Sequence, residues 1–154
     1  MPGLRLATAA DVPALAALYA DTARALGAGC YTPLQVAAWA GFGAATPAFF
    51  DYVMQARTWV AEAPAGTVLG FCGIASQGEV HSLYVRAGHG RQGLGGALLE
   101  HALTQARVAG SLRFAAWATP FSRPLFERAG FVLARTVREP FEGVMFERYR
   151  VALD

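Results

Sequence analysis

The most informative part of the sequence is the stretch Leu83-Tyr-Val-Arg-Ala-Gly-His-Gly-Arg-Gln-Gly-Leu-Gly-Gly-Ala97, which runs from a predicted strand through a glycine-rich loop into a predicted helix. Small residues let the backbone approach a ligand closely, and the first amides of a helix have no partner within it. The spacing Gly88-x-Gly90-x-x-Gly93 matches a dinucleotide-binding fingerprint, but that fingerprint requires an acidic residue at the end of the next strand. The next strand ends at Trp117 without one. We therefore expect a pyrophosphate cradle outside a dinucleotide-binding fold.

Hydrophobic spacing around this loop predicts an alternation of strands and helices along the whole chain. Three strands follow one another through tight turns in the middle of the chain, and strand–helix–strand units come after them. This order predicts an α/β (α+β) fold in which a mixed, mostly antiparallel central sheet is flanked by helices. Strands are expected near residues 4–7, 58–61, 67–74, 79–85, 112–117, 131–137 and 144–151, and helices near 12–26, 33–39, 47–53, 94–109 and 122–129.

The composition favours one folded domain, residues 1–154, because 55% of the residues are hydrophobic and 16% are charged. All 13 basic residues are arginine, and the chain contains no lysine. A Schiff base on a side chain, a phosphate-binding P-loop and a protein kinase site each need a lysine, so these chemistries are excluded.

Other features limit the partners and the location of the protein. The net charge is +2 and the arginines do not cluster, so no nucleic-acid partner is expected. Residues 25–50 carry no charge, but glycines and prolines interrupt them, and the N-terminus lacks a signal-peptide pattern. We expect no membrane partner and a cytoplasmic location, which the unpaired Cys30 and Cys72 also favour. The three histidines lack metal-ligand spacing, so no metal is expected.

Two segments resemble the acetyl-CoA-binding motifs of the GNAT superfamily of N-acetyltransferases. The first, residues 83–97, is similar to the family pattern Arg/Gln-x-x-Gly-x-Gly/Ala, with Gly93 and Gly95 at the glycine positions and Gly90 in place of Arg or Gln. The second, residues 117–131, is similar to Asn-x-x-Ala-x-x-Phe-Tyr-Glu-x-x-Gly-Phe, with Thr119 in the Asn position and Phe126 in the Tyr position. The order of elements also agrees with this family over nearly the whole chain, which implies a GNAT-like fold.

The resemblance implies direct acetyl transfer from acetyl-CoA, as co-substrate, to a primary amine of a small molecule or peptide in a ternary complex. The pantetheine arm would lie where the strand ending at Val85 splays from the strand beginning near Leu112. Backbone groups of Leu83 and Val85 would hold the arm, and a backbone amide near Leu83 would polarise the thioester carbonyl. The residues expected to bind the cofactor are Leu83, Tyr84, Val85, Arg91, Gln92, Gly93, Leu94, Gly95, Gly96, Ala97, Thr119 and Phe126.

The proton chemistry points to the strand before the loop, because Phe126 lacks the hydroxyl that many family members use as an acid. Strict alternation along the strand would place Glu79, His81, Leu83 and Val85 on one face. Glu79 is the first candidate for the general base and His81 the second, since a carboxylate works through a water and imidazole titrates near neutral pH. Tyr84 is a candidate acid, although alternation would turn it towards the opposite face.

The uncharged early segment is expected to line the acceptor end, with Tyr31 and Trp39 as substrate-binding residues. The alternative for both is simple helix packing. Phe126 and Gly90 also leave open a non-catalytic acyl-CoA-binding or sensing module on the same fold. The sequence names no acceptor amine, and a homodimer stays an open alternative.

Overall fold

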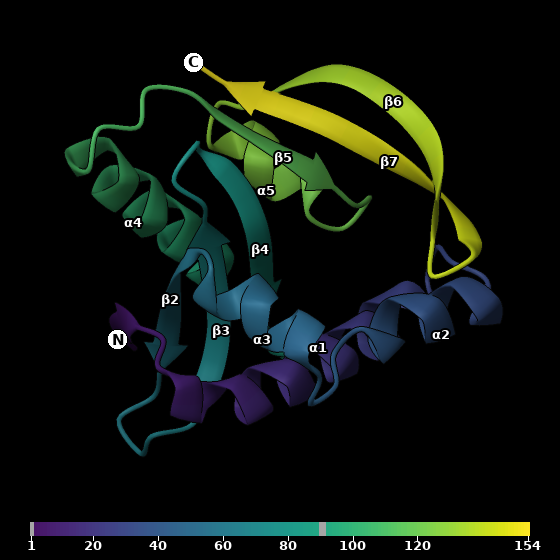
Figure 1. Cartoon of the computed structure of the whole chain (residues 1–154), viewed down its shortest axis with the longest axis horizontal. Helices are drawn as coiled ribbons and strands as arrows, with labels where there is room; N and C mark the ends of the chain where they lie inside the picture. Colours follow the sequence, from purple (N-terminus) through teal and green to yellow (C-terminus); the bar gives the residue numbers. More distant parts are fainter. Residues whose placement is uncertain (1, 90–91) are drawn as a thin grey trace.

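A computed structural model describes residues 2–89 and 92–154 of the chain. Its seven strands form one sheet in the order β1-β2-β3-β4-β5-β7-β6, and only the β4–β5 neighbours run parallel (Figure 1). The mixed, mostly antiparallel sheet predicted from the sequence is therefore confirmed. The strands are β1 (Gly3–Leu6), β2 (Arg57–Glu62), β3 (Val68–Ile74), β4 (Glu79–Val85), β5 (Phe114–Ala118), β6 (Val132–Phe141) and β7 (Val144–Leu153).

Helices cover both faces of the sheet. A short 3₁₀ turn, η1 (Ala9–Asp11), leads into α1 (Val12–Gly27), and α2 (Pro33–Gly41), α3 (Pro47–Met54), α4 (Leu94–Val108) and α5 (Arg123–Arg128) follow. Each of the five α-helices has a proline or glycine where the sequence predicts a start or a stop. Pro33 and Pro47 open α2 and α3, because a proline in the first turn loses no helical hydrogen bond.

Two hydrophobic clusters lie on opposite faces of the sheet. One joins α4 and α5 to the strands through Leu98, Leu99 and Phe126. The other joins α1, α2 and α3 to the strands and includes Leu15 and Phe49. Every residue of β3 is buried, as expected of a central strand covered on both faces.

The sheet divides between β4 and β5. These strands pair at only two positions, Glu79 with Ala115 and Val80 with Ala116. Beyond Val80 they diverge, and α5 lies beside the open end of β5 (Figure 1). The splay expected between the two strands is therefore present.

A β-bulge in β4 corrects the face that the sequence pattern assigns to its side chains. Val80 pairs with Ile74 and Ser82 with Gly73, so His81 is one extra residue opposite β3. A bulge of this kind reverses the alternation beyond it. Glu79 and His81 therefore lie on the side of Tyr84, which packs against the cluster of α1 to α3, whereas Leu83 and Val85 pack on the α4 side. The expectation that Glu79, His81, Leu83 and Val85 share one face is wrong.

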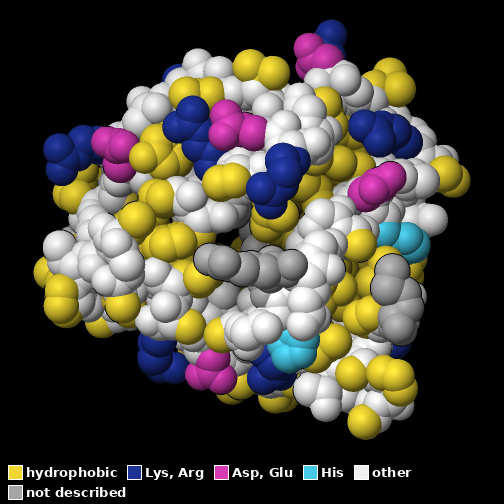
Figure 2. All heavy atoms as spheres, turned by 180° about the vertical axis from the view of Figure 1, so that it is seen from behind, with side chains coloured by type: hydrophobic (Ala, Val, Ile, Leu, Met, Phe, Trp, Pro, Cys, Tyr) yellow, Lys and Arg dark blue, Asp and Glu magenta, His cyan; other side chains and the backbone are white. Residues whose placement is uncertain are grey.

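The β6–β7 hairpin curves over the sheet so that its turn reaches α2 (Figure 1). The Gln35 side-chain amide of α2 donates a hydrogen bond to the Met145 carbonyl at 2.9 Å. On the face opposite that of Figure 1, charged side chains are dispersed in small groups among hydrophobic ones (Figure 2). Within residues 2–89 and 92–154, no helix has the length and hydropathy needed to cross a bilayer.

Candidate active site

A groove of about 350 Å³ follows the divergence of β4 and β5, and we call it the β4–β5 groove. Leu83, Tyr84 and Val85 form one wall, and Thr119 and Phe126 lie on the other. Five residues that the sequence predicts as cofactor-binding are thus brought together around one elongated space. Unpaired strand ends leave peptide groups facing this space, which suits a ligand that carries amides of its own.

A second cavity of about 510 Å³ adjoins the groove on the side of α1, α2 and α3, and we call it the aromatic cavity. Both predicted acceptor residues, Tyr31 and Trp39, line it, and so do all three candidates for proton transfer. The two spaces share part of their lining, so a ligand in one would meet a ligand in the other. The shared residues are Trp39, Val80, His81, Tyr84, Trp117 and Thr119.

Glu79 is held by a bidentate ion pair with Arg150 of β7. Arg150 Nη1 lies 2.8 Å from Glu79 Oε2, and Nη2 lies 2.7 Å from Oε1. The carboxylate raises the pKa of Arg150 further above its ordinary value through these hydrogen bonds. The guanidinium also lies over the Trp117 ring, 5.0 Å from its centroid. Both carboxylate oxygens of the first-ranked base candidate are therefore already engaged by a cation.

His81 has a more open environment. Its side chain is exposed at the cavity, and its ring lies parallel to that of Tyr52 at a centroid distance of 6.3 Å. The Tyr52 hydroxyl donates to the His81 carbonyl at 2.8 Å, which fixes the backbone of the bulge. No residue in the described part of the chain hydrogen-bonds to the His81 imidazole.

Tyr84 lies where the groove and the cavity meet. The Trp39 indole Nε1–H donates to its Oη at 3.2 Å. Burial raises the pKa of the Tyr84 phenol above its ordinary value, so the hydroxyl keeps its proton at neutral pH. Because an indole nitrogen only donates, the Tyr84 proton must point to another acceptor.

Tyr31 and Trp39 form an aromatic wall with their neighbours. The two rings meet edge to face at 5.6 Å, and Tyr31 also contacts Phe146 at 5.3 Å. Burial raises the pKa of Tyr31 to about 12, so this hydroxyl also stays protonated. Helix packing and cavity lining, which the sequence presents as alternatives, both apply to these residues.

The start of α4 presents free backbone amides near the groove. Gly93 precedes the helix with φ +75°, a left-handed conformation that glycine adopts without steric cost. A Cβ on Gly95 would lie 3.0 Å from the Leu125 side chain, so glycine allows α4 to pack closely against α5. Gln92, Leu94, Gly96 and Ala97 belong to the same turn, whereas the predicted Arg91 lies outside the described residues.

Several of the predicted contact groups already have partners within the protein. The Thr119 hydroxyl accepts hydrogen bonds from the amides of Phe121 and Ser122, so it caps the turn before α5. The Val85 carbonyl accepts from the buried Thr22 hydroxyl at 3.3 Å. Phe126 is 3% exposed and packs edge to face on Phe131 at 5.0 Å, so most of its ring is already in contact with the protein.

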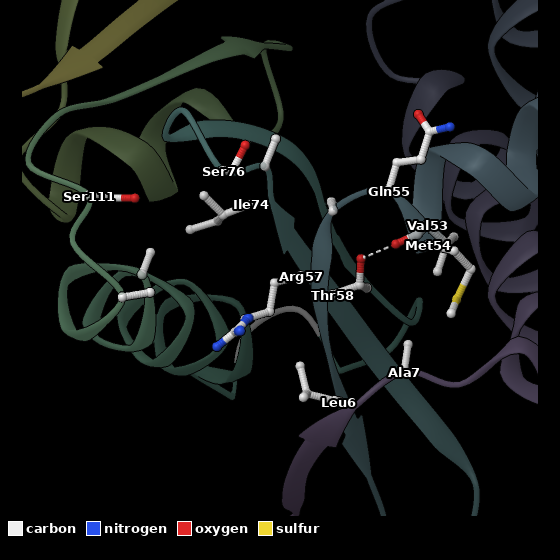
Figure 3. Close-up of a pocket in the computed structure, with 14 residues that line it drawn as sticks. Leu6, Ala7, Val53, Met54, Gln55, Arg57, Thr58, Ile74, Ser76 and Ser111 are labelled. Carbon is white, nitrogen blue, oxygen red and sulfur yellow. Dashed lines mark hydrogen bonds between the residues drawn. The ribbon is translucent and has the colours of Figure 1, made fainter.

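A third cavity, of about 490 Å³, lies between the ends of β2, α3 and α4 (Figure 3). Its lining contains one charged side chain, Arg57, and none of the predicted site residues. The Thr58 hydroxyl beside it donates to the Val53 carbonyl at 2.7 Å (Figure 3). This cavity therefore lacks the paired acid and base candidates of the aromatic cavity.

The described residues contain no group of three or more His, Cys, Asp or Glu side chains that could hold a metal ion.

Comparison with known proteins agrees with this geometry. Residues 29–153 match the model of the acetyltransferase (GNAT) domain. The chain therefore belongs to the GNAT family of acetyltransferases, enzymes that use acetyl-CoA. No curated protein matches the chain.

Solved structures share the fold at low sequence identity. A GCN5-related N-acetyltransferase from Rhodopseudomonas palustris is 21% identical, with a TM-score of 0.92 over 99% of this chain and 94% of that chain. The paia N-acetyltransferase from Thermoplasma acidophilum, in complex with coenzyme A, is 16% identical, with a TM-score of 0.80 over 99% and 98%. The yncA protein from Salmonella typhimurium, with its cofactor acetyl-CoA, is 19% identical, with a TM-score of 0.68 over 99% and 93%.

Sequence reasoning missed two groups of residues at this site. Arg150 is 71 positions from Glu79, and only strand order brings the two together. Tyr19 and Tyr52 stand beside Tyr84 in the cavity, where burial raises the pKa of both phenols. The helical spacing indicates that both tyrosines are buried, but it does not indicate which buried side chains line a cavity.

Proposed function

We propose that this protein transfers an acetyl group from acetyl-CoA to a primary amine of a small molecule or peptide by direct attack in a ternary complex. The observation that carries this proposal is the junction of the two spaces at His81 and Tyr84. The β4–β5 groove suits the pantetheine arm, and the aromatic cavity suits the acceptor. The amine and the thioester would then meet at the shared wall, which supplies the proximity that such a reaction needs.

The cofactor would be bound mainly through backbone groups. The first amides of α4, from Leu94 to Gly96, would offer free N–H groups to the pyrophosphate, and the helix dipole would add to the attraction. Leu83, Tyr84 and Val85 would hold the pantetheine arm on one side, with Thr119 and Phe126 on the other. Gln92, Gly93 and Ala97 would complete the cradle, and the sequence also predicts a contact from Arg91, which lies outside the described residues.

His81 is the base that the geometry favours. The amine nitrogen attacks the thioester carbonyl carbon, the C–N bond forms, and the proton leaving nitrogen passes to the free imidazole directly or through a water. Glu79 would contribute negative charge beside the ammonium, with its position fixed by Arg150. To accept the proton itself, Glu79 would have to bind it on an oxygen that already accepts a hydrogen bond from the Arg150 guanidinium.

The departing sulfur takes the electron pair of the broken C–S bond. A thiolate is a stable leaving group near neutral pH, so an acid is helpful without being essential. Tyr84 is the proposed donor, because it lies where the groove and the cavity meet and its buried hydroxyl keeps its proton at neutral pH.

A non-catalytic acyl-CoA-binding module is the second candidate, and Phe126 is the observation that favours it. A phenylalanine in this buried position removes the hydroxyl that many family members use to protonate the thiolate. On this alternative, coenzyme A would bind in the groove without transfer.

A thiol-release assay with acetyl-CoA and a panel of amines tests both candidates. Transfer supports the enzyme, whereas tight coenzyme A binding without turnover on any amine supports the binding module. His81→Gln is expected to lower kcat by about 100-fold with little change in the KM for acetyl-CoA. His101→Gln is the matched control, because His101 of α4 packs on Trp59 of β2 and lines neither the groove nor the aromatic cavity. A His81→Gln enzyme within threefold of the parent would contradict the assignment of the base.

A further inference from the structure

The aromatic cavity is walled by rings that support one another. Phe42 meets Tyr52 edge to face at 5.2 Å and Phe141 at 6.0 Å, and Phe141 meets Phe146 at 6.1 Å. Edge-to-face contacts hold each ring in a defined orientation, so the walls are preorganised. Walls of this kind favour a flat apolar group over a flexible polar chain.

The charges around this cavity do not cancel. Glu79 is paired with Arg150, and Arg148 is paired with Glu139 at 3.0 Å. Asp51 and Glu147 also line the cavity, and neither has a basic partner among residues 2–89 and 92–154. The one further cation that the described residues place near the lining is Arg135, whose guanidinium lies 5.4 Å from the centroid of the Trp117 ring. The two unpaired carboxylates outnumber it, so the mouth is net negative, which attracts an ammonium group and repels a carboxylate.

The cavity is closed on one side. The hairpin contact between Gln35 and Met145 brings the β6–β7 turn onto α2, and Phe141 and Phe146 of that hairpin form part of the cavity wall. A peptide that reacts through an internal side-chain amine would need an open path on both sides, and one that reacts through its N-terminal amine would need an open path for the chain that follows. A volume of about 510 Å³ suits a compact ligand bound by most of its surface.

We infer that the acceptor is a compact primary amine carried on an aromatic ring, with no carboxylate and no second positive charge. The ammonium would be drawn to the acidic mouth and to the faces of the surrounding rings, while the apolar body fills the aromatic wall. This inference rests on the proposed function and narrows its acceptor class.

An acceptor panel separates failure of this inference from failure of the proposed function. The four acceptors are phenethylamine, phenylalanine, spermidine and a short peptide with a free N-terminal amine, each assayed with acetyl-CoA. We expect kcat/KM for phenethylamine to exceed that of every other acceptor by about tenfold or more. Preferred transfer to spermidine, phenylalanine or the peptide overturns the acceptor class and leaves the enzyme in place. No transfer to any of the four overturns the acceptor class, and the thiol-release assay on the wider panel of amines then decides whether the proposed function fails as well.

Two pairs of variants test which side chains recognise the acceptor. Phe141→Leu should lower kcat/KM for phenethylamine by about fivefold to tenfold and that for methylamine by less than twofold, because only the aryl body loses its ring contact. Phe50→Leu is the control, since Phe50 is 42% exposed on α3 and lies outside the cavity lining. Asp51→Asn should raise the KM for phenethylamine, with the exposed Asp21→Asn on α1 as its control. Equal effects of Phe141→Leu on the two amines, or equal effects of Asp51→Asn and Asp21→Asn, overturn the inference.

Discussion

The Glu79–Arg150 pair allows a quantitative test of how the two parts of the sheet are joined beside the active site. Glu79 begins β4 and Arg150 belongs to β7, and the two hydrogen bonds of 2.7 and 2.8 Å cross over β5. The perturbation is Arg150→Met, which keeps an unbranched side chain and removes the charge. We expect it to lower the free energy of unfolding and to release Glu79.

The exposure of the pair sets the expected size of the effect. Fully exposed ion pairs contribute about 0.2–1 kcal/mol, whereas removing one partner of a buried pair costs about 3–5 kcal/mol. The side chains of Arg150 and Glu79 are 21% and 31% exposed, so this pair lies between the two limits. We expect a coupling free energy of about 1–2 kcal/mol, after allowing for the water that still reaches the carboxylate. Loss of the contact with Trp117 adds about 0.5–1 kcal/mol to the single substitution Arg150→Met.

Urea denaturation of the parent, Glu79→Gln, Arg150→Met and the double variant measures the coupling. The exposed pair of Asp21 and Arg24 supplies a control cycle, since its single contact is 3.5 Å and its side chains are 67% and 63% exposed. The control coupling should fall below about 0.5 kcal/mol. A Glu79–Arg150 coupling equal to that of the control would refute the view that this pair holds Glu79 in place.

Two further predictions concern stability. Trp39→Phe should lower the free energy of unfolding by about 1 kcal/mol, because it removes the indole donor to Tyr84. The same substitution should cost less in a Tyr84→Phe background, and equal costs in thermal denaturation of both backgrounds would contradict the hydrogen bond. Hydrogen bonds from Arg5 lower the pKa of Asp11 from 3.8 to about 2, so the carboxylate stabilises the fold above its ordinary pKa and this contribution disappears as the pH falls towards 2. Asp11→Asn should therefore cost about 1–2 kcal/mol at pH 7, a value reduced because the Arg5 side chain is 39% exposed, and progressively less below pH 4. A cost that does not change with pH would contradict this assignment.

The fold could be predicted from the sequence because its signals are local. Hydrophobic periodicity, Pro33 and Pro47 at helix starts, and glycines at turns each depend on a few neighbouring residues. The segment from Leu83 to Ala97 places the loop between its strand and helix without knowledge of any distant contact.

The arrangement of the site could not be predicted in the same way. One extra residue at His81 changes which side chains face the cavity, and a bulge leaves no mark in the hydrophobic pattern. The partner of Glu79 comes from a strand 71 residues away, and its choice depends on strand order and register. Tyr84 shows both effects, since the bulge directs it to the cavity and Trp39 of α2 fixes its hydroxyl.

The hairpin contact also has a consequence for synthesis of the chain on the ribosome. Gln35 and Met145 are 110 residues apart, and β7 lies between β5 and β6 in the sheet. A nascent chain can complete β1 to β4 with α1 to α3 early, yet it lacks Phe146 and Arg150 until β7 has been made. The walls of the aromatic cavity are thus completed only once β7 has been synthesised, and a chain truncated before β7 would expose the apolar rings that β7 helps to enclose.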